Sequence, residues 1–168
     1  MLDLEAVLSE IVGRLSAPSH ADRAPLLLIA GPSGSGKTRV LRALQARHGY
    51  RYVNLSLELS GRLRRCERGR FLAARDEALA LLRPQLGSPI GIDHIEVLFH
   101  PLLRLDPLAF LLDLCRGGAV VAAWPGEYDG ARLTYAVPGH PEYVDVPAEN
   151  LHGCQIIRLE GQGCATQI

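Results

Sequence analysis

The stretch of residues 26–48 constrains this chain more than any other part of the sequence. It begins with an apolar run at residues 26–30, continues through the glycine-rich turn GPSGSGKT at residues 31–38, and ends in a helical pattern that stops at Gly49. Strand, turn and helix in this order form the context in which GxxxxGK[ST] is a phosphate-binding loop. The alternative, a glycine turn that matches the motif by chance, requires motif, strand and helix to coincide.

Each residue type in this turn has a physical role in holding phosphate. Gly34 and Gly36 allow backbone conformations that a Cβ atom would oppose, so that the N–H groups of residues 34–38 can point inward as a nest for phosphate oxygens. The N-terminus of the following helix adds partial positive charge. The Lys37 amine is expected to reach the β- and γ-phosphates, and the Thr38 hydroxyl to bind Mg²⁺. The predicted nucleotide-binding residues are Gly31, Pro32, Ser33, Gly34, Ser35, Gly36, Lys37, Thr38 and Arg39.

Lys37 is the sole lysine in a chain whose lysines and arginines together number 18. Lysine presents a compact ammonium with rotatable donors, whereas arginine presents a planar fork. The lysine therefore stands where a compact cation is chemically required, although codon bias and chance also account for a single residue.

A second chemically distinctive position follows the short apolar run at residues 89–92. Asp93 ends this run, as in a Walker B strand whose terminal Asp holds Mg²⁺; the alternative is an Asp that caps the next helix. Many hydrolysing proteins of this class have a Glu next, which polarises the attacking water, but here the residue is His94. Glu96 takes that role if the backbone turns, and is otherwise a surface carboxylate. The predicted catalytic residues are Lys37, Asp93 and Glu96, and the predicted metal ligands are Thr38 and Asp93.

The remainder of the chain alternates helical and extended patterns. Apolar residues at three- and four-residue spacing predict helices, and Asp106 followed by Pro107 predicts a further helix start. Alternating or continuous apolar runs predict strands. The expected elements are helices at 2–15, 71–82 and 107–116, strands at 50–59, 89–93 and 119–124, a strand or hairpin at 132–137, a loop at 138–150 and an edge strand at 155–159.

A cluster of arginines lies between the second and third predicted strands. Three interpretations remain open: a solvated helix face and loop, an arginine that completes a neighbouring subunit's or partner's site, or a nucleic-acid patch. The last is weakened because no aromatic residues alternate with the arginines. The cluster consists of Arg62, Arg64, Arg65, Arg68, Arg70 and Arg75.

Strands that alternate with helices predict a mainly parallel sheet flanked by helices, with the nucleotide at the carboxyl edge of the strands. The expected fold class is therefore α/β, a single P-loop NTPase domain over residues 1–168 with no separate AAA+ helical lid. Within it we expect an N-terminal amphipathic helix at 2–15, a nucleotide-binding core at 26–137 and a loop-rich C-terminal tail at 138–168.

The end of the predicted strand at 119–124 departs from the usual ATPase pattern. Many ATPases place a polar residue there that senses the γ-phosphate, whereas this chain has Trp124 and Pro125, with Glu127 just beyond. The departure weakens a strict AAA+ assignment. Trp124 is interpreted as a core residue, with a platform for the nucleobase as the alternative.

Composition excludes several classes of protein. The formal net charge is zero, so bulk electrostatics offer no argument for nucleic-acid binding. The four cysteines form no CxxC pair, which speaks against a zinc ribbon or a thioredoxin motif. No signal peptide is visible and no apolar run approaches the length of a membrane span. A cytoplasmic protein with reduced thiols is expected.

Several blocks of the sequence together resemble one family. LLLIAGPSGSGKTRVLRAL, YRYVNLSLELS, IDHIEVLF with LDPL, and VVAAWPGEYDG followed by LTYAVPGHPEY resemble BrxF, the small P-loop protein of type 3 BREX bacteriophage-exclusion systems. The first block is common to P-loop proteins, and the later blocks carry the specificity. The resemblance covers most of residues 25–143. It implies a cytoplasmic, nucleotide-dependent component of an anti-phage system that works with a larger ATPase, a DNA methyltransferase and a PglZ-type protein. It also implies nucleotide and Mg²⁺ roles for Gly36, Lys37, Thr38 and Asp93.

Three functions are compatible with these observations. The first is an ATP-dependent switch or assembly subunit with weak ATPase activity, which acts through self-association, through other defence proteins, or on double-stranded DNA directly or via partners. The second is a small-molecule kinase for a nucleotide, nucleoside or sugar. The third is a module that binds ATP or another nucleoside triphosphate structurally, without turnover. The expected cofactors are ATP and Mg²⁺, and no contact with a membrane is expected.

Overall fold

The computed structural model describes residues 2–16, 24–63, 71–80, 82 and 88–161. Its centre is a five-stranded, fully parallel sheet in the order β2-β3-β4-β1-β8. A second, three-stranded antiparallel sheet has the order β5-β6-β7. The strands of the larger sheet are β1 (Leu26–Ala30), β2 (Arg51–Asn54), β3 (Ile90–Asp93), β4 (Val120–Trp124) and β8 (Cys154–Arg158).

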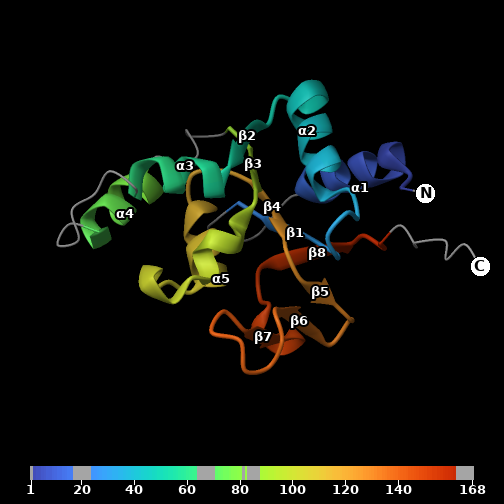
Figure 1. Cartoon of the computed structure of the whole chain (residues 1–168). Coiled ribbons are helices and arrows are strands. Elements are labelled where there is room, and N and C mark those ends of the chain that lie inside the picture. The colour runs from blue at the N-terminus through green and yellow to red at the C-terminus, as the bar shows by residue number, and fades with distance from the viewer. Residues whose placement is uncertain (1, 17–23, 64–70, 81, 83–87, 162–168) are drawn as a thin grey trace, which may run out of the picture.

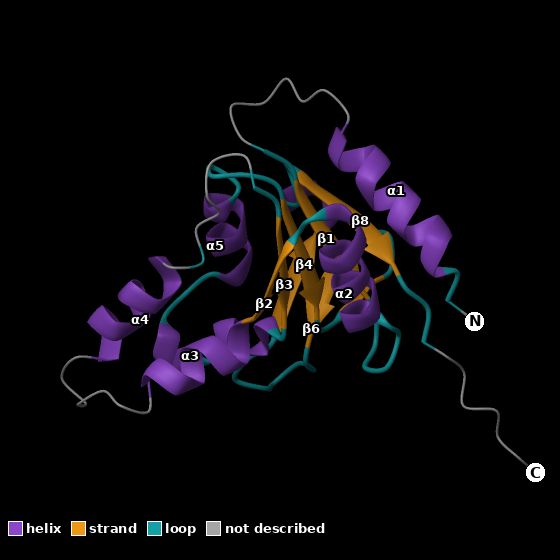
Figure 2. Cartoon of the chain, turned by 90° about the horizontal axis from the view of Figure 1, so that it is seen from above, coloured by secondary structure: helices purple, strands orange, loops and turns teal. Residues whose placement is uncertain are grey.

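Helices cover both faces of the larger sheet (Figure 2). α1 (Leu4–Ser16) and α2 (Lys37–His48) pack on one face, where alternate residues of β1 and β4 form one apolar cluster with them. α3 (Leu55–Leu63) and α5 (Pro107–Leu114) pack on the other face with the 3-10 helix η2 (Ile95–Phe99), and form a second cluster there. The other helices in the described residues are α4 (Phe71–Ala80), η3 (Pro101–Leu103) and η4 (Ala148–Asn150).

Two of the three inner strands of the sheet, β4 and β1, consist of apolar residues alone. Every residue of β1 and β4 is buried, because both faces of each strand are covered by helices. β4 lies between β1 and β3, so the strand that leads into the glycine-rich turn and the strand that ends in Asp93 are not neighbours. All three strands run in parallel, and their carboxyl ends therefore meet at one edge.

Most predicted elements are confirmed, including the mainly parallel α/β sheet. The predicted strands at 26–30, 89–93 and 119–124 correspond to β1, β3 and β4, and the predicted edge strand at 155–159 corresponds to β8. Asp106 caps α5 by accepting a hydrogen bond from the Ala109 N–H at 2.9 Å. The described residues after Trp124 form short strands and a 3-10 turn, so no helical lid follows the sheet in this part of the chain.

The predicted strand at 50–59 is wrong in its second half. β2 ends at Asn54, and the next residues form α3. The Asn54 side chain accepts a hydrogen bond from the Leu57 N–H at 3.0 Å, which caps the new helix. Leu55 and Leu59, one helical turn apart, are both buried. The apolar pattern of residues 55–59 is therefore compatible with a helix as well as with a strand.

The predicted loop at 138–150 is also wrong in part. It contains β7 (Val144–Pro147), which pairs with β6 (Arg132–Tyr135), and β6 pairs in turn with β5 (Glu127–Tyr128). Val144 and Val146 pack against the apolar cluster under the larger sheet, which stabilises the strand despite its polar neighbours. Figure 1 shows this smaller sheet beside the carboxyl end of the larger one. The division of the chain into domain and tail stays a prediction.

The arginine cluster is only partly described. Arg64, Arg65, Arg68 and Arg70 lie outside the described residues, and Arg62 falls within α3. Arg75 on α4 is no solvated side chain, because its guanidinium donates to the Leu103 carbonyl and pairs with Asp76. In the described part of the chain, no helix combines the length and the apolar character needed to cross a membrane.

Candidate nucleotide-binding site

A cavity of about 490 Å³ lies where β1, β3 and β4 end, and most of the predicted site residues line it. It joins the glycine-rich turn, the first turn of α2, and the chain that leaves β3. Gly31 and Pro32 are the two predicted nucleotide-binding residues that do not line it. The lining residues are Ser33, Gly34, Ser35, Gly36, Lys37, Thr38, Arg39, Asp93, His94, Glu96, Ala123 and Pro125.

The turn has the backbone that a phosphate nest requires. Gly34 and Gly36 have φ of 78° and 98°, in the left-handed region that residues with a Cβ rarely adopt. Gly36 is also the N-cap of α2 and carries no side-chain cap, so the first N–H groups of this helix are free of a capping side chain. An anion in the cavity would meet both the turn and a helix N-terminus.

The Lys37 amine lies against the turn itself. It donates to the Gly31 carbonyl, to the Pro32 carbonyl at 2.9 Å and to the Ser35 hydroxyl at 3.5 Å. Burial lowers the pKa of Lys37 from its usual value, and the negative charges of Glu96 and Asp93 oppose that shift. Negative charge added to the cavity by phosphates would oppose it further and favour the charged amine.

Asp93 is almost completely buried and has both carboxylate oxygens engaged. Its side chain is at the carboxyl end of β3 and the residue is 3% exposed. Oδ1 accepts from the His94 N–H at 2.9 Å, and Oδ2 accepts from the Tyr52 hydroxyl at 2.9 Å. The 3-10 helix after it is capped by His94 without a side-chain bond, so Asp93 is not the helix cap that the alternative interpretation required.

The donor atoms around the cavity fit Mg²⁺. Thr38 and Asp93 offer a hydroxyl and a carboxylate, the hard oxygen ligands that this cation prefers, and both line the same cavity. Among the described residues no group of three or more His, Cys, Asp or Glu could hold a metal ion. A cation that takes one or two protein ligands and completes its shell with phosphate oxygens and water suits such a site, and Mg²⁺ binds in this way.

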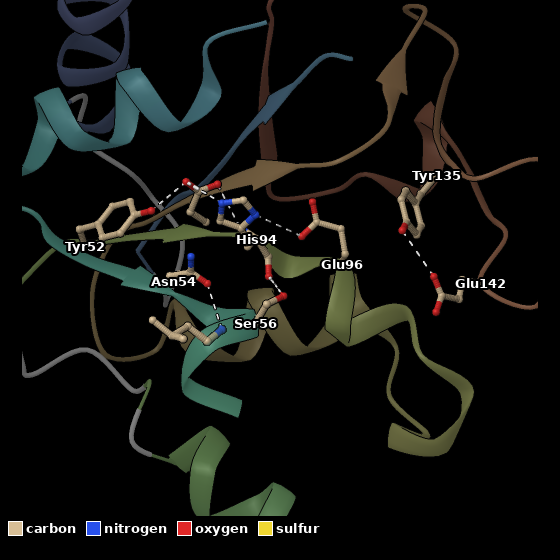
Figure 3. Close-up of polar contacts among 9 residues, drawn as sticks. Tyr52, Asn54, Ser56, His94, Glu96, Tyr135 and Glu142 are labelled. Atoms are coloured by element: carbon tan, nitrogen blue, oxygen red, sulfur yellow. Dashed lines mark hydrogen bonds and ion pairs between the residues drawn. The ribbon is translucent and has the colours of Figure 1, made fainter. Parts of the chain in front are cut away.

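The backbone does turn after Asp93, as a role for Glu96 requires. His94 has φ of 53°, and the chain enters η2 directly after it. Glu96 consequently lines the cavity, where its negative charge favours a higher pKa of the Lys37 amine. His94 Nε2 lies 3.9 Å from Asp93 Oδ2, and Nδ1 lies 3.9 Å from Glu96 Oε2. Figure 3 shows the His94 ring beside Glu96.

Trp124 is a core residue, as predicted, and not a platform for the nucleobase. It is fully buried, its indole N–H donates to the Thr134 carbonyl at 2.9 Å, and its ring meets Phe99 edge-on at 5.1 Å. Ala123 and Pro125, rather than a polar side chain, form the cavity wall at the end of β4. Glu127 lines a separate cavity of about 290 Å³.

Sequence reasoning missed two residues beside the site. Tyr52, predicted only as part of a strand, bonds to Asp93, and the Arg42 guanidinium of α2 lies 3.6 Å from the centre of the Tyr52 ring. The sequence offered one signal for Tyr52. It is an aromatic residue with a polar hydroxyl, two positions before the end of β2, the strand next to the one that ends in Asp93.

Comparison with known proteins adds little to this geometry. No family model matches the chain, and no curated protein matches it. Among solved structures, the chain is similar to a crystal structure of a DNA replication initiation factor, with 15% sequence identity and a TM-score of 0.49. The match covers 92% of this chain and 44% of that one, so the chain spans less than half the length of the protein it matches. A likeness this distant carries no argument about function.

Proposed function

We propose that this protein binds ATP with Mg²⁺ in the cavity at the end of β1, and hydrolyses it slowly as a nucleotide-dependent switch or assembly subunit. One observation carries the proposal: the glycine-rich turn, Lys37, Thr38 and Asp93 line a single cavity. The turn and the lysine are adjacent in sequence. Asp93 is distant in sequence and lies near them because the parallel strands β1, β4 and β3 end at the same edge of the sheet.

Different residues of the cavity would bind different parts of a triphosphate and its cation. The N–H groups of residues 34–38 would bind phosphate oxygens. The Lys37 amine would exchange the Gly31 and Pro32 carbonyls for the β- and γ-phosphates. Thr38 and Asp93 would hold Mg²⁺. The bound cation would neutralise charge on the phosphate oxygens.

Slow turnover is expected from the residues that succeed Asp93 in the chain. Glu96 is the carboxylate placed to orient an attacking water, but its side chain is 43% exposed and is approached by His94. A carboxylate that is free to move loses part of the advantage of fixed orientation. At the end of β4 the described cavity wall consists of Ala123 and Pro125, which carry no charge. An arginine from a neighbouring subunit or a partner would supply the positive charge that stabilises the transferred phosphoryl group.

The sequence resemblance to BrxF supports placing this activity in a BREX-type defence system. In that setting the nucleotide would control self-association or the binding of other defence proteins. Double-stranded DNA would be reached directly or through those partners. The balanced net charge favours the second route, because the phosphate backbone attracts basic surfaces.

The first test is nucleotide binding by the parent and by Lys37→Ala, measured calorimetrically in Mg²⁺. Loss of the amine removes charge-assisted bonds to phosphate and should weaken binding roughly 10- to 100-fold. Arg47→Ala is the matched control, because Arg47 is in the last turn of the same helix and pairs with Glu5 on the surface. Equal affinity of Lys37→Ala and the parent would contradict the site assignment.

Turnover then separates the competing functions. ATP hydrolysis is measured alone, with double-stranded DNA and with small phosphoryl acceptors, while the particle mass is recorded with and without ATP and Mg²⁺. Nucleotide-dependent assembly, or turnover that responds to DNA, supports the switch. Stimulation by a small acceptor would identify a kinase, and tight binding by a fixed monomer without turnover would identify a structural module.

A further inference from the structure

The Tyr52 hydroxyl bonds to the one buried carboxylate of the site without entering the cavity. Tyr52 donates to Asp93 Oδ2 at 2.9 Å, yet it is not among the residues that line the cavity. Its hydroxyl therefore holds the carboxylate without forming part of the cavity wall. Tyr52 lies on β2, the strand next to the one that ends in Asp93. Figure 3 shows its phenol directed toward the side where His94 lies.

The register of the two strands explains how the phenol reaches Asp93. Tyr52 on β2 is paired with Gly91 on β3, and Asp93 lies two residues farther along, on the same face of the sheet. Gly91 has no side chain to stand between the ring and the carboxylate. A Cβ atom there would lie 3.3 Å from Leu41 of α2, so this face is closely packed. The tyrosine is thus held in place by the sheet and by the helix above it.

Arg42 connects this arrangement to the phosphate-binding helix. Its guanidinium carbon lies 3.6 Å from the centre of the Tyr52 ring, a cation–π geometry. Arg42 belongs to α2, whose first two residues are Lys37 and Thr38. The stack Arg42–Tyr52–Asp93 therefore runs from the helix that would bind phosphate to the carboxylate that would hold the cation.

We propose that Tyr52 is a positioning residue for Mg²⁺-dependent nucleotide binding, an inference that rests on the function proposed above. The His94 N–H holds Oδ1 and the phenol holds Oδ2, so both carboxylate oxygens have a fixed partner and each keeps further acceptor capacity. Asp93 itself lines the cavity. Partners that orient a metal ligand in this way commonly matter 10- to 100-fold, as a rough measure, for metal affinity. Arg42 packs on the Tyr52 ring and so acts one step farther from the cation.

The test is the affinity for a non-hydrolysable ATP analogue, measured by calorimetry once in Mg²⁺ and once in EDTA. Tyr52→Phe removes only the hydroxyl. The ratio of the affinity in Mg²⁺ to the affinity in EDTA should fall by about tenfold or more, because the affinity in Mg²⁺ decreases and the affinity in EDTA is unchanged. Tyr50→Phe is the matched control, because Tyr50 is a buried tyrosine just before β2 that packs in the same apolar cluster. Its ratio should equal that of the parent.

Arg42→Met supplies a second, independent variant. The position is exposed on α2, so folding is expected to tolerate the change, and the ratio should fall about two- to fivefold through loss of the cation over the ring. An unchanged ratio in Tyr52→Phe, or equal losses in Mg²⁺ and EDTA, would overturn the inference and leave the proposed function intact. A parent that binds no nucleotide in either condition would overturn both.

Discussion

At the scale of single residues, the proposed hydrolysis depends on the positions of His94 and Glu96. The chain has a histidine where many hydrolysing relatives of this fold have a glutamate, and a left-handed His94 then directs the backbone so that Glu96 lines the cavity. For the proposed hydrolysis, both residues are therefore candidates for orienting the attacking water. They differ in chemistry, because Glu96 is an acceptor when ionised and His94 has one donor and one acceptor when neutral.

Glu96→Gln decides between them. If Glu96 is the general base, this change should lower ATP turnover about 100-fold while affinity for ATP and Mg²⁺ stays within about a factor of three. Phosphate release under saturating ATP is the measurement. Glu58→Gln, the same substitution at an exposed position of α3, is the control. Loss of turnover in His94→Ala with full activity in Glu96→Gln would assign the role to the histidine instead.

At the scale of elements, the junction between the two sheets leaves no room for a side chain at Gly126. Gly126 follows β4, and a Cβ atom there would overlap the Thr134 carbonyl oxygen and lie 2.7 Å from its carbon. The Gly126 carbonyl accepts from the Gly31 N–H at 2.9 Å, at the start of the glycine-rich turn. Because backbone cannot move aside cheaply, the smaller sheet and the turn are held together through this glycine.

Two glycine substitutions should consequently have opposite signs. Gly126→Ala should lower the free energy of unfolding by at least about 2 kcal/mol, because the new methyl group meets backbone atoms. Gly13→Ala, on the exposed side of α1 with nothing within 4 Å of the new Cβ, should raise it by about 0.5–1 kcal/mol. Urea denaturation followed by circular dichroism measures both. Equal effects would show that the junction is looser than described.

The boundaries of elements were predictable only where local signals were unambiguous. Asp106–Pro107 specifies a helix start by itself, because the cap and the fixed φ of proline act locally. The apolar alternation that begins at Tyr52 does not, since Leu55 and Leu59 suit a strand face and a helix face alike. The Asn54 cap and the packing of α3 under the sheet decide between the two.

At the scale of the whole molecule, β8 completes the sheet beside β1. The pairing joins Leu26 to Cys154 and Ala30 to Arg158, more than a hundred residues away in the sequence. Burial in this position raises the pKa of the Cys154 thiol to about 11. The thiol is therefore a reporter of whether β8 is docked.

Alkylation of Cys154 should depend on docking and on pH. Raising the pKa from 9.0 to about 11 lowers the thiolate fraction at pH 8 by about 100-fold, so the folded protein should react at least that much more slowly than the urea-unfolded chain. Mass spectrometry of the Cys154 peptide after iodoacetamide treatment measures the rate. Because the folded pKa is the higher one, the thiol's contribution to stability is present below pH 9 and is lost as pH rises toward 11. Similar rates in the folded and unfolded chains would contradict a docked β8.

The sequence by itself determined the glycine-rich turn, the lysine at its end, and the buried strands β1 and β4, because motif spacing and continuous apolar runs are local properties. It also singled out Asp93 and Glu96 as candidates. Only the tertiary structure brought them to one cavity, since β4 enters between β1 and β3 and no local signal specifies strand order. The contact of Tyr52 with Asp93 and the closing of the sheet by β8 depend on residues distant in the chain, and packing alone decides such neighbours.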